Sequence, residues 1–419
     1  MRPAAAAAAS VLDQAASSAT NILVLVIAAR VSTAPGFAAF SMVYLTFTVL
    51  LGLNMAYVGQ AVVLERDAAR LGTACRSAVT FTACAAATAA VLLAAGGALA
   101  GGRTGHAFAA LGLVLPLVLV QDGLRYAFSA LRTPARALAA DTLRLACVVP
   151  ALLIQPPHAG PARLVAVWGL SALPALLLGL ALLRPLIRGA GVHLAPYLRR
   201  GHLGARFLVE FAVGNASSQL AVLGLGLFAN PLTVGALRGA TTLFGPLNVL
   251  FNSVNAFAPP VLSRLGGRRR TVRAAAALGL ALAATALAWA AVLYALPDRA
   301  GRGLLGATWN AAAALLPASG TQYAVMGLGT CALVTLRVLS PRATLSVQVV
   351  FSLLSVVLML GGYGLGGAAG AAWGLAVGSA LKAVAAWTRV ARTPADAPAD
   401  EAADDATGDD AQRSAAPRS

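Results

Sequence analysis

Four charged residues stand inside apolar stretches of this sequence, where each needs a partner. Asp122 and Arg125 are three residues apart, as are Asp141 and Arg144, so each pair lies on one face of a helix. At 1.5 Å per residue, Arg125 lies about 10 Å and Asp141 about 8 Å from the turn over residues 132–136. An antiparallel hairpin brings them level, and Asp122 level with Arg144. We predict an internally neutral four-charge cluster that either locks the hairpin or belongs to a gate or headgroup site.

Two further arginines have no acidic partner at helical spacing. Arg238 lies within an apolar run, so its partner must be a residue on another helix, such as Glu210, or an anionic substrate. Arg30 ends the first apolar run, where it either faces a cavity or extends to the membrane interface.

Amides and hydroxyls also recur at helical spacing. Asn248, Asn252 and Asn255 follow one another at i, i+4 and i+7. Two looser polar stripes comprise Asp13, Ser17, Thr20 and Asn21, and Asn215, Ser218 and Gln219. Small and polar residues also serve helix packing. As cavity lining, amides hydrogen-bond sugars and guanidinium groups bind phosphate, so the pattern suits a ligand with many hydroxyls and an anionic group.

Catalytic chemistry has little support. The four histidines fall in predicted loops or at their edges, and no serine or cysteine stands near them at nucleophile spacing. The four cysteines lack CxxC spacing, and no GxxxxGK[ST] phosphate loop occurs. We therefore expect a protein that is not an enzyme and uses no metal or cofactor.

The composition indicates which elements position these groups. Of 419 residues, 59% are hydrophobic and only 11% are charged, whereas a soluble domain has about 25% charged residues. A bilayer core requires about 20 apolar residues per helix. We predict an all-α polytopic membrane protein with about twelve spans: 11–31, 37–64, 77–100, 107–131, 137–156, 161–183, 204–228, 234–262, 274–296, 310–338, 343–363 and 366–390.

The loops between these spans predict an orientation. Sixteen basic residues fall in the loops on one side and five on the other, which places both termini in the cytoplasm. The segment 391–419 holds seven of the fourteen acidic residues, and we expect a disordered tail there.

The chain also repeats itself at an offset of about 200 residues. Leu115-Pro116 recurs as Leu316-Pro317, and Gln121 recurs as Gln322. A parallel duplication predicts two pseudo-symmetric six-helix lobes, over 1–190 and 191–390.

One stretch carries a family resemblance. Residues 13–21 (DQAASSATN), then Ala29-Arg30, then residues 36–41 (GFAAFS) resemble the opening of polysaccharide and O-antigen-type flippases. These flippases belong to the multidrug/oligosaccharidyl-lipid/polysaccharide exporter superfamily. Gly-Phe stands here where Phe-Gly is usual. Leu304–Trp309 also looks like a recurrent segment of that family.

The resemblance implies two lobes around a cationic cavity, alternating access, and a polyprenyl-diphosphate-linked glycan as substrate. Arg30 and Arg238 are the implied diphosphate ligands, followed by Arg125 and Arg144. It further implies a multi-pass plasma membrane protein of cell-surface polysaccharide biosynthesis. Such a protein would act as a monomer beside glycan polymerase or ligase machinery, without nucleic acid.

Three alternatives remain at this point. A cation-coupled multidrug antiporter of the same superfamily needs an unpaired cavity carboxylate, for which Asp13 and Glu210 are candidates. A major facilitator needs a basic loop motif that residues 65–72 and 264–270 match only in part. A membrane scaffold for a polymerase complex predicts that neutralising the cavity arginines leaves function intact.

Overall fold

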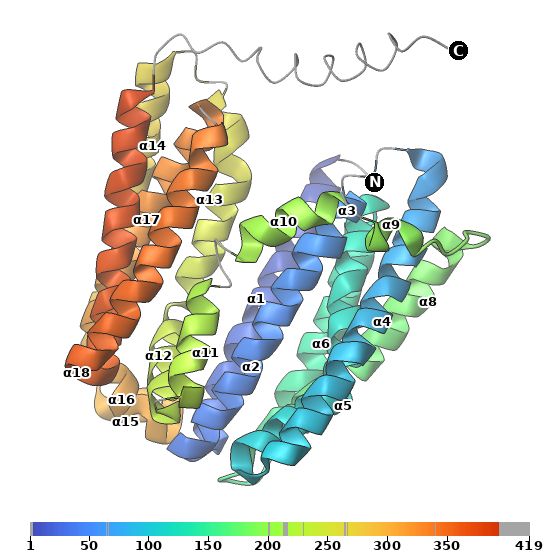
Figure 1. Ribbon diagram of the computed structural model, residues 1–419, viewed down its shortest axis with the longest axis horizontal. Coiled ribbons are helices and arrows are strands. Elements are labelled where there is room, and N and C mark those ends of the chain that lie inside the picture. The colour runs from blue at the N-terminus through green and yellow to red at the C-terminus, as the bar shows by residue number, and fades with distance from the viewer. Residues whose placement is uncertain are drawn as a thin grey trace, which may run out of the picture.

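The computed structural model describes residues 3–63, 65, 67–199, 202–212, 217–228, 230–263, 265, 267–339 and 341–393. Within these ranges the helices form two bundles side by side (Figure 1). We call the end at which α1 begins and α18 ends the terminal end. The acidic tail expected over 391–419 lies almost entirely outside the described residues.

The first bundle is built from the N-terminal half of the chain. Its elements are α1 (Pro3–Val31), α2 (Ala34–Asn54), the π-helix η1 (Met55–Gly59), α3 (Gln60–Val63), α4 (Ala68–Ala100), α5 (Gly102–Ala130), α6 (Pro134–Leu153), α7 (Pro161–Leu170) and α8 (Leu173–Leu183). Helix starts follow local chemistry. The Thr33 hydroxyl accepts a hydrogen bond from the Gly36 backbone N–H at 3.2 Å, which caps α2.

The described residues of the connection between the bundles form short helices. They are η2 (Arg184–Ile187), α9 (Ala195–Leu198) and α10 (Leu203–Phe211). Helix α10 crosses the terminal end between the two bundles (Figure 1). The prediction of a boundary near residue 190 remains a prediction.

The second bundle follows. Its elements are α11 (Ser217–Phe228), α12 (Pro231–Leu243), α13 (Gly245–Ser263), α14 (Arg268–Tyr294), α15 (Asp298–Leu305), η4 (Gly306–Thr308), α16 (Trp309–Ala313), α17 (Leu316–Leu339) and α18 (Pro341–Arg392). The 52 residues of α18 include a break at Gly366 and Gly367, whose φ values are −150° and 57°. The two halves fold back on each other, with Gly362 against Gly370, so α18 supplies the last two predicted spans.

The described helices agree with an all-α polytopic membrane protein. Eight helical stretches among them are long and apolar enough to cross a bilayer, and α18 counts once although it folds back. Helix α6 falls short because it carries Arg136, Asp141 and Arg144 within 20 residues. Apolar side chains also cover outer surfaces, as Leu92 and Leu99 do on α4 with exposures of 69% and 89%, which is the surface that a lipid environment favours.

The bundles meet at the end away from the termini, which we call the closed end. There Gly235 of α12 faces α2, and a Cβ atom at Gly235 would lie 3.2 Å from the Ala38 Cα. Gly306, with φ of 55°, faces α1, and a Cβ atom there would lie 2.8 Å from the Ala29 carbonyl oxygen. Absence of a side chain at both glycines therefore lets the bundles approach by their backbones.

Candidate functional site

A polar cavity of about 590 Å³ lies between the two bundles. Helices α1 and α2 form one wall, and helices α11, α12, α13, α17 and α18 form the other. Its polar lining residues are Gln14, Ser18, Asn21, Tyr44, Thr48, Gln219, Arg238, Thr241, Thr242, Asn248, Ser319, Gln322 and Tyr323. The volume falls in the range of small-molecule sites.

Among the described residues that line the cavity, Arg238 is charged and the others are neutral. Its guanidinium carbon lies 5.8 Å from the ring centre of Tyr44 on the opposite wall, a cation–π contact. Its Nε atom is buried without a hydrogen-bond partner, and the described residues form no ion pair with it. Arg238 is half-buried, and a guanidinium group without a carboxylate partner attracts anions, so this position favours an anionic ligand.

Neutral hydrogen-bonding groups surround Arg238. The Tyr44 hydroxyl donates to the Asn21 side-chain oxygen at 2.8 Å, which leaves the Asn21 amide N–H groups as donors. On the other wall, the Asn248 amide donates to the Tyr323 hydroxyl at 3.1 Å. These groups can hydrogen-bond the hydroxyls of a sugar.

One hydrogen bond crosses the cavity between the bundles. The Thr48 hydroxyl on α2 donates to the Gln219 side-chain oxygen on α11 at 2.8 Å. A rocking motion of the bundles would break this bond.

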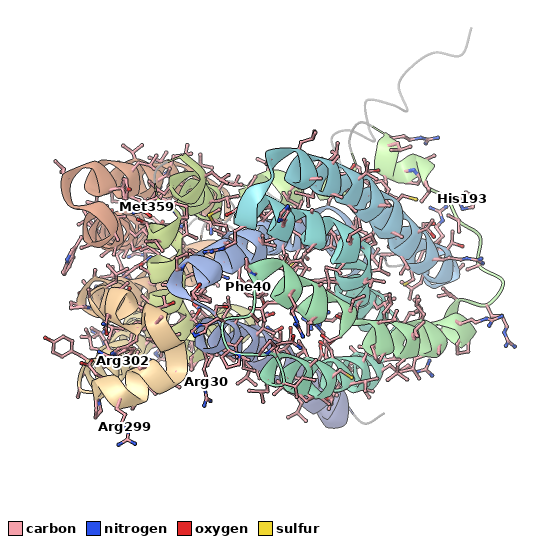
Figure 2. All side chains as sticks on the ribbon, turned by 90° about the horizontal axis from the view of Figure 1, so that it is seen from below. Arg30, Phe40, His193, Arg299, Arg302 and Met359 are labelled. Atoms are coloured by element: carbon pink, nitrogen blue, oxygen red, sulfur yellow. The ribbon has the colours of Figure 1, made fainter. Side chains whose placement is uncertain are left out.

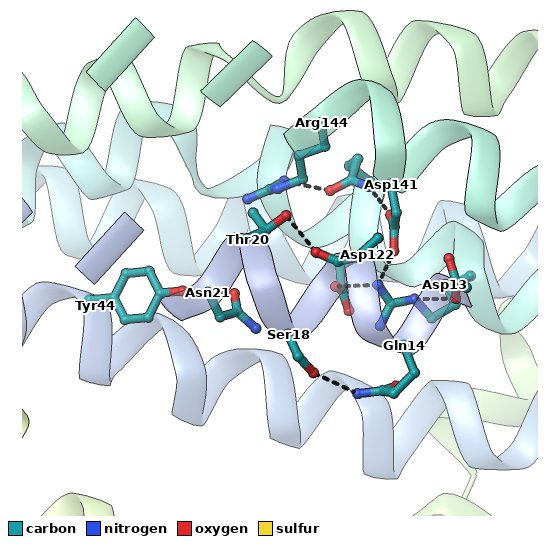
Figure 3. A network of polar contacts seen from close by, with 12 residues as sticks. Asp13, Gln14, Ser18, Thr20, Asn21, Tyr44, Asp122, Asp141 and Arg144 are labelled. Atoms are coloured by element: carbon teal, nitrogen blue, oxygen red, sulfur yellow. Dashed lines mark hydrogen bonds and ion pairs between the residues drawn. The ribbon is translucent and has the colours of Figure 1, made fainter. Parts of the chain in front are cut away.

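A buried ion network lies beside the cavity within the first bundle (Figure 3). The Arg125 guanidinium lies 3.2 Å from Asp13 and 4.0 Å from Asp122, and it forms a close ion pair and hydrogen bond with Asp141. The Gln121 amide donates to Asp141 at 2.9 Å. One guanidinium group thus contacts three carboxylates from three helices.

The hairpin prediction is confirmed for Arg125 and Asp141, whereas Asp122 and Arg144 share the cluster without direct contact. Arg125 and Asp141 meet across the α5–α6 hairpin as their depths predict. Asp122 and Arg144 form no ion pair; the Arg144 guanidinium donates instead to Gln121 and lies 5.9 Å from the Trp168 ring centre. The cluster is also not internally neutral, because Asp13 of α1 adds a third carboxylate.

Arg30 lies outside the cavity. It ends α1 near the closed end, is exposed, and its side chain points away from the bundles (Figure 2). Helix α2 begins four residues later, at Ala34, so Arg30 lies at the edge of the bundle. The side chains of Glu210, Asn252 and Asn255 lie outside the description.

Several site residues escape the sequence analysis. Tyr44 and Tyr323 sit in apolar or mixed runs with no polar periodicity. Their only signal is a hydrogen-bonding group inside a predicted span, since such groups need partners there. Gln121 and Gln322 do appear as repeat partners, and they lie in the network and the cavity respectively.

Comparisons with known proteins identify the fold. The sequence matches no family model and no curated protein. The structure is similar to the lipid II flippase MurJ in an inward closed conformation, with a TM-score of 0.66 at 11% identity, covering 90% of this chain and 86% of that one.

Two multidrug transporters are also similar. One is an inward-facing multidrug resistance MATE family transporter of the MOP superfamily, with a TM-score of 0.60 at 11% identity over 90% of this chain and 94% of that chain. The other is a point mutant of the Vibrio cholerae MATE transporter VcmN, with 0.57 at 15% identity over 92% and 94%. The fold that the resemblance of the opening motif implies is thus confirmed.

Proposed function

We propose that this protein is a flippase, which moves a lipid-linked oligosaccharide across the plasma membrane by alternating access for cell-surface polysaccharide biosynthesis. The observation that carries the proposal is Arg238, an unpaired guanidinium in a cavity otherwise lined by neutral groups. Such a lining fits a phosphate joined to sugars better than an apolar drug.

The mechanism follows from the position of the cavity. Arg238 binds the phosphate while the amides of Asn21 and Asn248 bind sugar hydroxyls, and the lipid chain stays in the bilayer. The bundles then separate at the Gly235 and Gly306 contacts and close at the opposite end. With the termini in the cytoplasm, as the basic loops indicate, the closed end faces outward.

The antiporter alternative has weaker support. It requires an unpaired carboxylate in the cavity, yet the described lining contains no acidic residue. Asp13, its described candidate, lies 3.2 Å from Arg125 in the ion network. The other candidate, Glu210, has a side chain outside the description.

Reconstitution tests the proposal. The full chain is placed in vesicles with a lipid-linked oligosaccharide that carries a fluorescent sugar, and a membrane-impermeant quencher reports transbilayer movement. We expect Arg238→Gln to reduce the rate at least tenfold, since a charge-assisted hydrogen bond contributes about 1.5–3 kcal/mol. Arg299→Gln, an exposed arginine near the closed end (Figure 2), is the matched control. Unchanged movement in Arg238→Gln would show that Arg238 does not bind the transported headgroup, and no movement with the unaltered chain would favour the scaffold alternative.

A further inference from the structure

The charges of the residues that line the cavity restrict the charge of its substrate. Of the described lining residues, one is cationic and none is acidic. A diphosphate diester carries two negative charges at neutral pH, whereas a phosphodiester carries one. One guanidinium matches one negative charge.

The neighbouring ion network provides no second cation. Arg125 already contacts the carboxylates of Asp13, Asp122 and Asp141. Together with Arg144, these groups include three carboxylates and two guanidinium groups, so their formal sum is negative. Neither guanidinium group of this network lines the cavity.

Two aromatic rings separate Arg144 from the cavity. Its guanidinium carbon lies 5.9 Å from the Trp168 ring centre, and that ring lies 5.4 Å from the ring of Tyr44, which also contacts Arg238. Arg144 is also held by its hydrogen bond to Gln121. It does not line the cavity.

The described residues of the second bundle contribute no cation to the cavity lining other than Arg238. Lys382 of α18 contacts the Ser352 hydroxyl at 3.2 Å, inside the α18 hairpin, and it is not a lining residue. A dianionic headgroup would therefore have one charge without a cationic partner among the described lining residues.

We infer that the substrate is a glycolipid whose headgroup carries a single negative charge, namely a glycan joined to its lipid by one phosphodiester rather than by a diphosphate. This inference rests on the proposed flippase function and specifies its substrate. The neutral amides and hydroxyls around Arg238 then bind the glycan, and Arg238 binds the single phosphate.

The test uses a matched pair of lipids. Both carry the same polyprenyl chain and the same fluorescent neutral sugar, and they differ only in a phosphate or a diphosphate link. In vesicles containing the full chain, we expect the phosphodiester lipid to be moved at least tenfold faster. Gln322→Arg adds a second cation to the lining, and we expect it to reduce this preference at least tenfold. The Arg299→Gln variant keeps the original preference.

The outcomes separate the two proposals. Equal or faster movement of the diphosphate lipid overturns the single-charge inference and leaves the flippase function standing. If neither lipid moves faster than in protein-free vesicles, the flippase function itself fails. Melting temperatures of each variant in detergent show whether a loss reflects unfolding.

Discussion

The Arg125 guanidinium on α5 lies 3.2 Å from the carboxylate of Asp13 on α1, two residues separated by more than one hundred positions in the chain. This contact ties the first helix of the chain to the α5–α6 hairpin. Since Asp122 and Asp141 share the same guanidinium group, a single cation contacts carboxylates from three helices. The network therefore holds helix α1, whose side chains line one wall of the cavity, against the rest of the first bundle.

Removal of this cation provides the first prediction. Arg125→Gln leaves three buried carboxylates without their counter-charge, and breaking a buried pair costs about 3–5 kcal/mol. We expect the melting temperature in detergent to fall by on the order of 10 °C. Adding Asp141→Asn to this variant removes one of the uncompensated charges and should restore part of the loss. A melting temperature equal to that of the Arg299→Gln control would show that the network does not stabilise the bundle.

The sequence predicts only the local part of this site. Helical spacing places Asp122 beside Arg125, and equal depth in a hairpin brings in Asp141. The contact with Asp13 depends on how α1 packs against α6, which no short-range pattern encodes. Arg144 turns to Gln121 and Trp168 for the same reason, because a tertiary neighbour offers a nearer acceptor than Asp122.

The fold was more accessible to prediction than the site. Apolar runs bounded by charges, prolines and glycines indicate the spans, because lipid leaves no alternative to internally hydrogen-bonded helices. Hydropathy does not predict where the two bundles meet, because this contact depends on close approach of the backbones at Gly235 and Gly306. It also cannot show that α10 crosses the terminal end, since α10 and α11 read as one span.

The closed end gives the second prediction. A side chain at Gly235 must push α12 away from Ala38, so Gly235→Val should shift the bundles toward a state open at this end. Spin labels at positions 163 and 299, in a background without native cysteines, report the separation by pulsed electron resonance. Gly224→Val on α11, where a Cβ atom meets nothing within 4 Å, should leave the distances unchanged. Identical distributions in both variants would contradict a glycine-dependent closure.

The contact of α10 with α2 and η1 predicts a pH dependence. The His202 ring lies 4.8 Å from Tyr57 and 4.9 Å from Tyr197, and its Nδ1 atom accepts a hydrogen bond from the Gly204 backbone N–H at 3.1 Å. Burial lowers the pKa of His202 below its ordinary value of 6.5.

Because the folded state binds this proton less readily than the unfolded state, stability is lost as the pH falls through 6.5 and levels off below the lowered pKa. Hydrogen exchange in α10 should therefore be faster at about pH 5.5 than at about pH 7.5 after correction for the intrinsic exchange rate. His202→Gln should abolish the difference, and His193→Gln, in the loop before α9, should retain it. An equal pH response in both variants would assign the effect to another group.

The break in α18 gives the last prediction. A straight helix of its 52 residues would extend about 78 Å, far beyond a bilayer core of about 30 Å. The reversal depends on Gly367, whose φ of 57° disfavours other residues. Gly367→Ala should destabilise the protein by about 1–2 kcal/mol, visible as a lower melting temperature.

Gly364→Ala lies three residues earlier, without a positive φ and with nothing within 4 Å of its Cβ position. In the helix it replaces glycine by a better helix former, so it should be neutral or stabilising. Equal melting temperatures for the two variants would show that the reversal does not depend on the backbone freedom of Gly367.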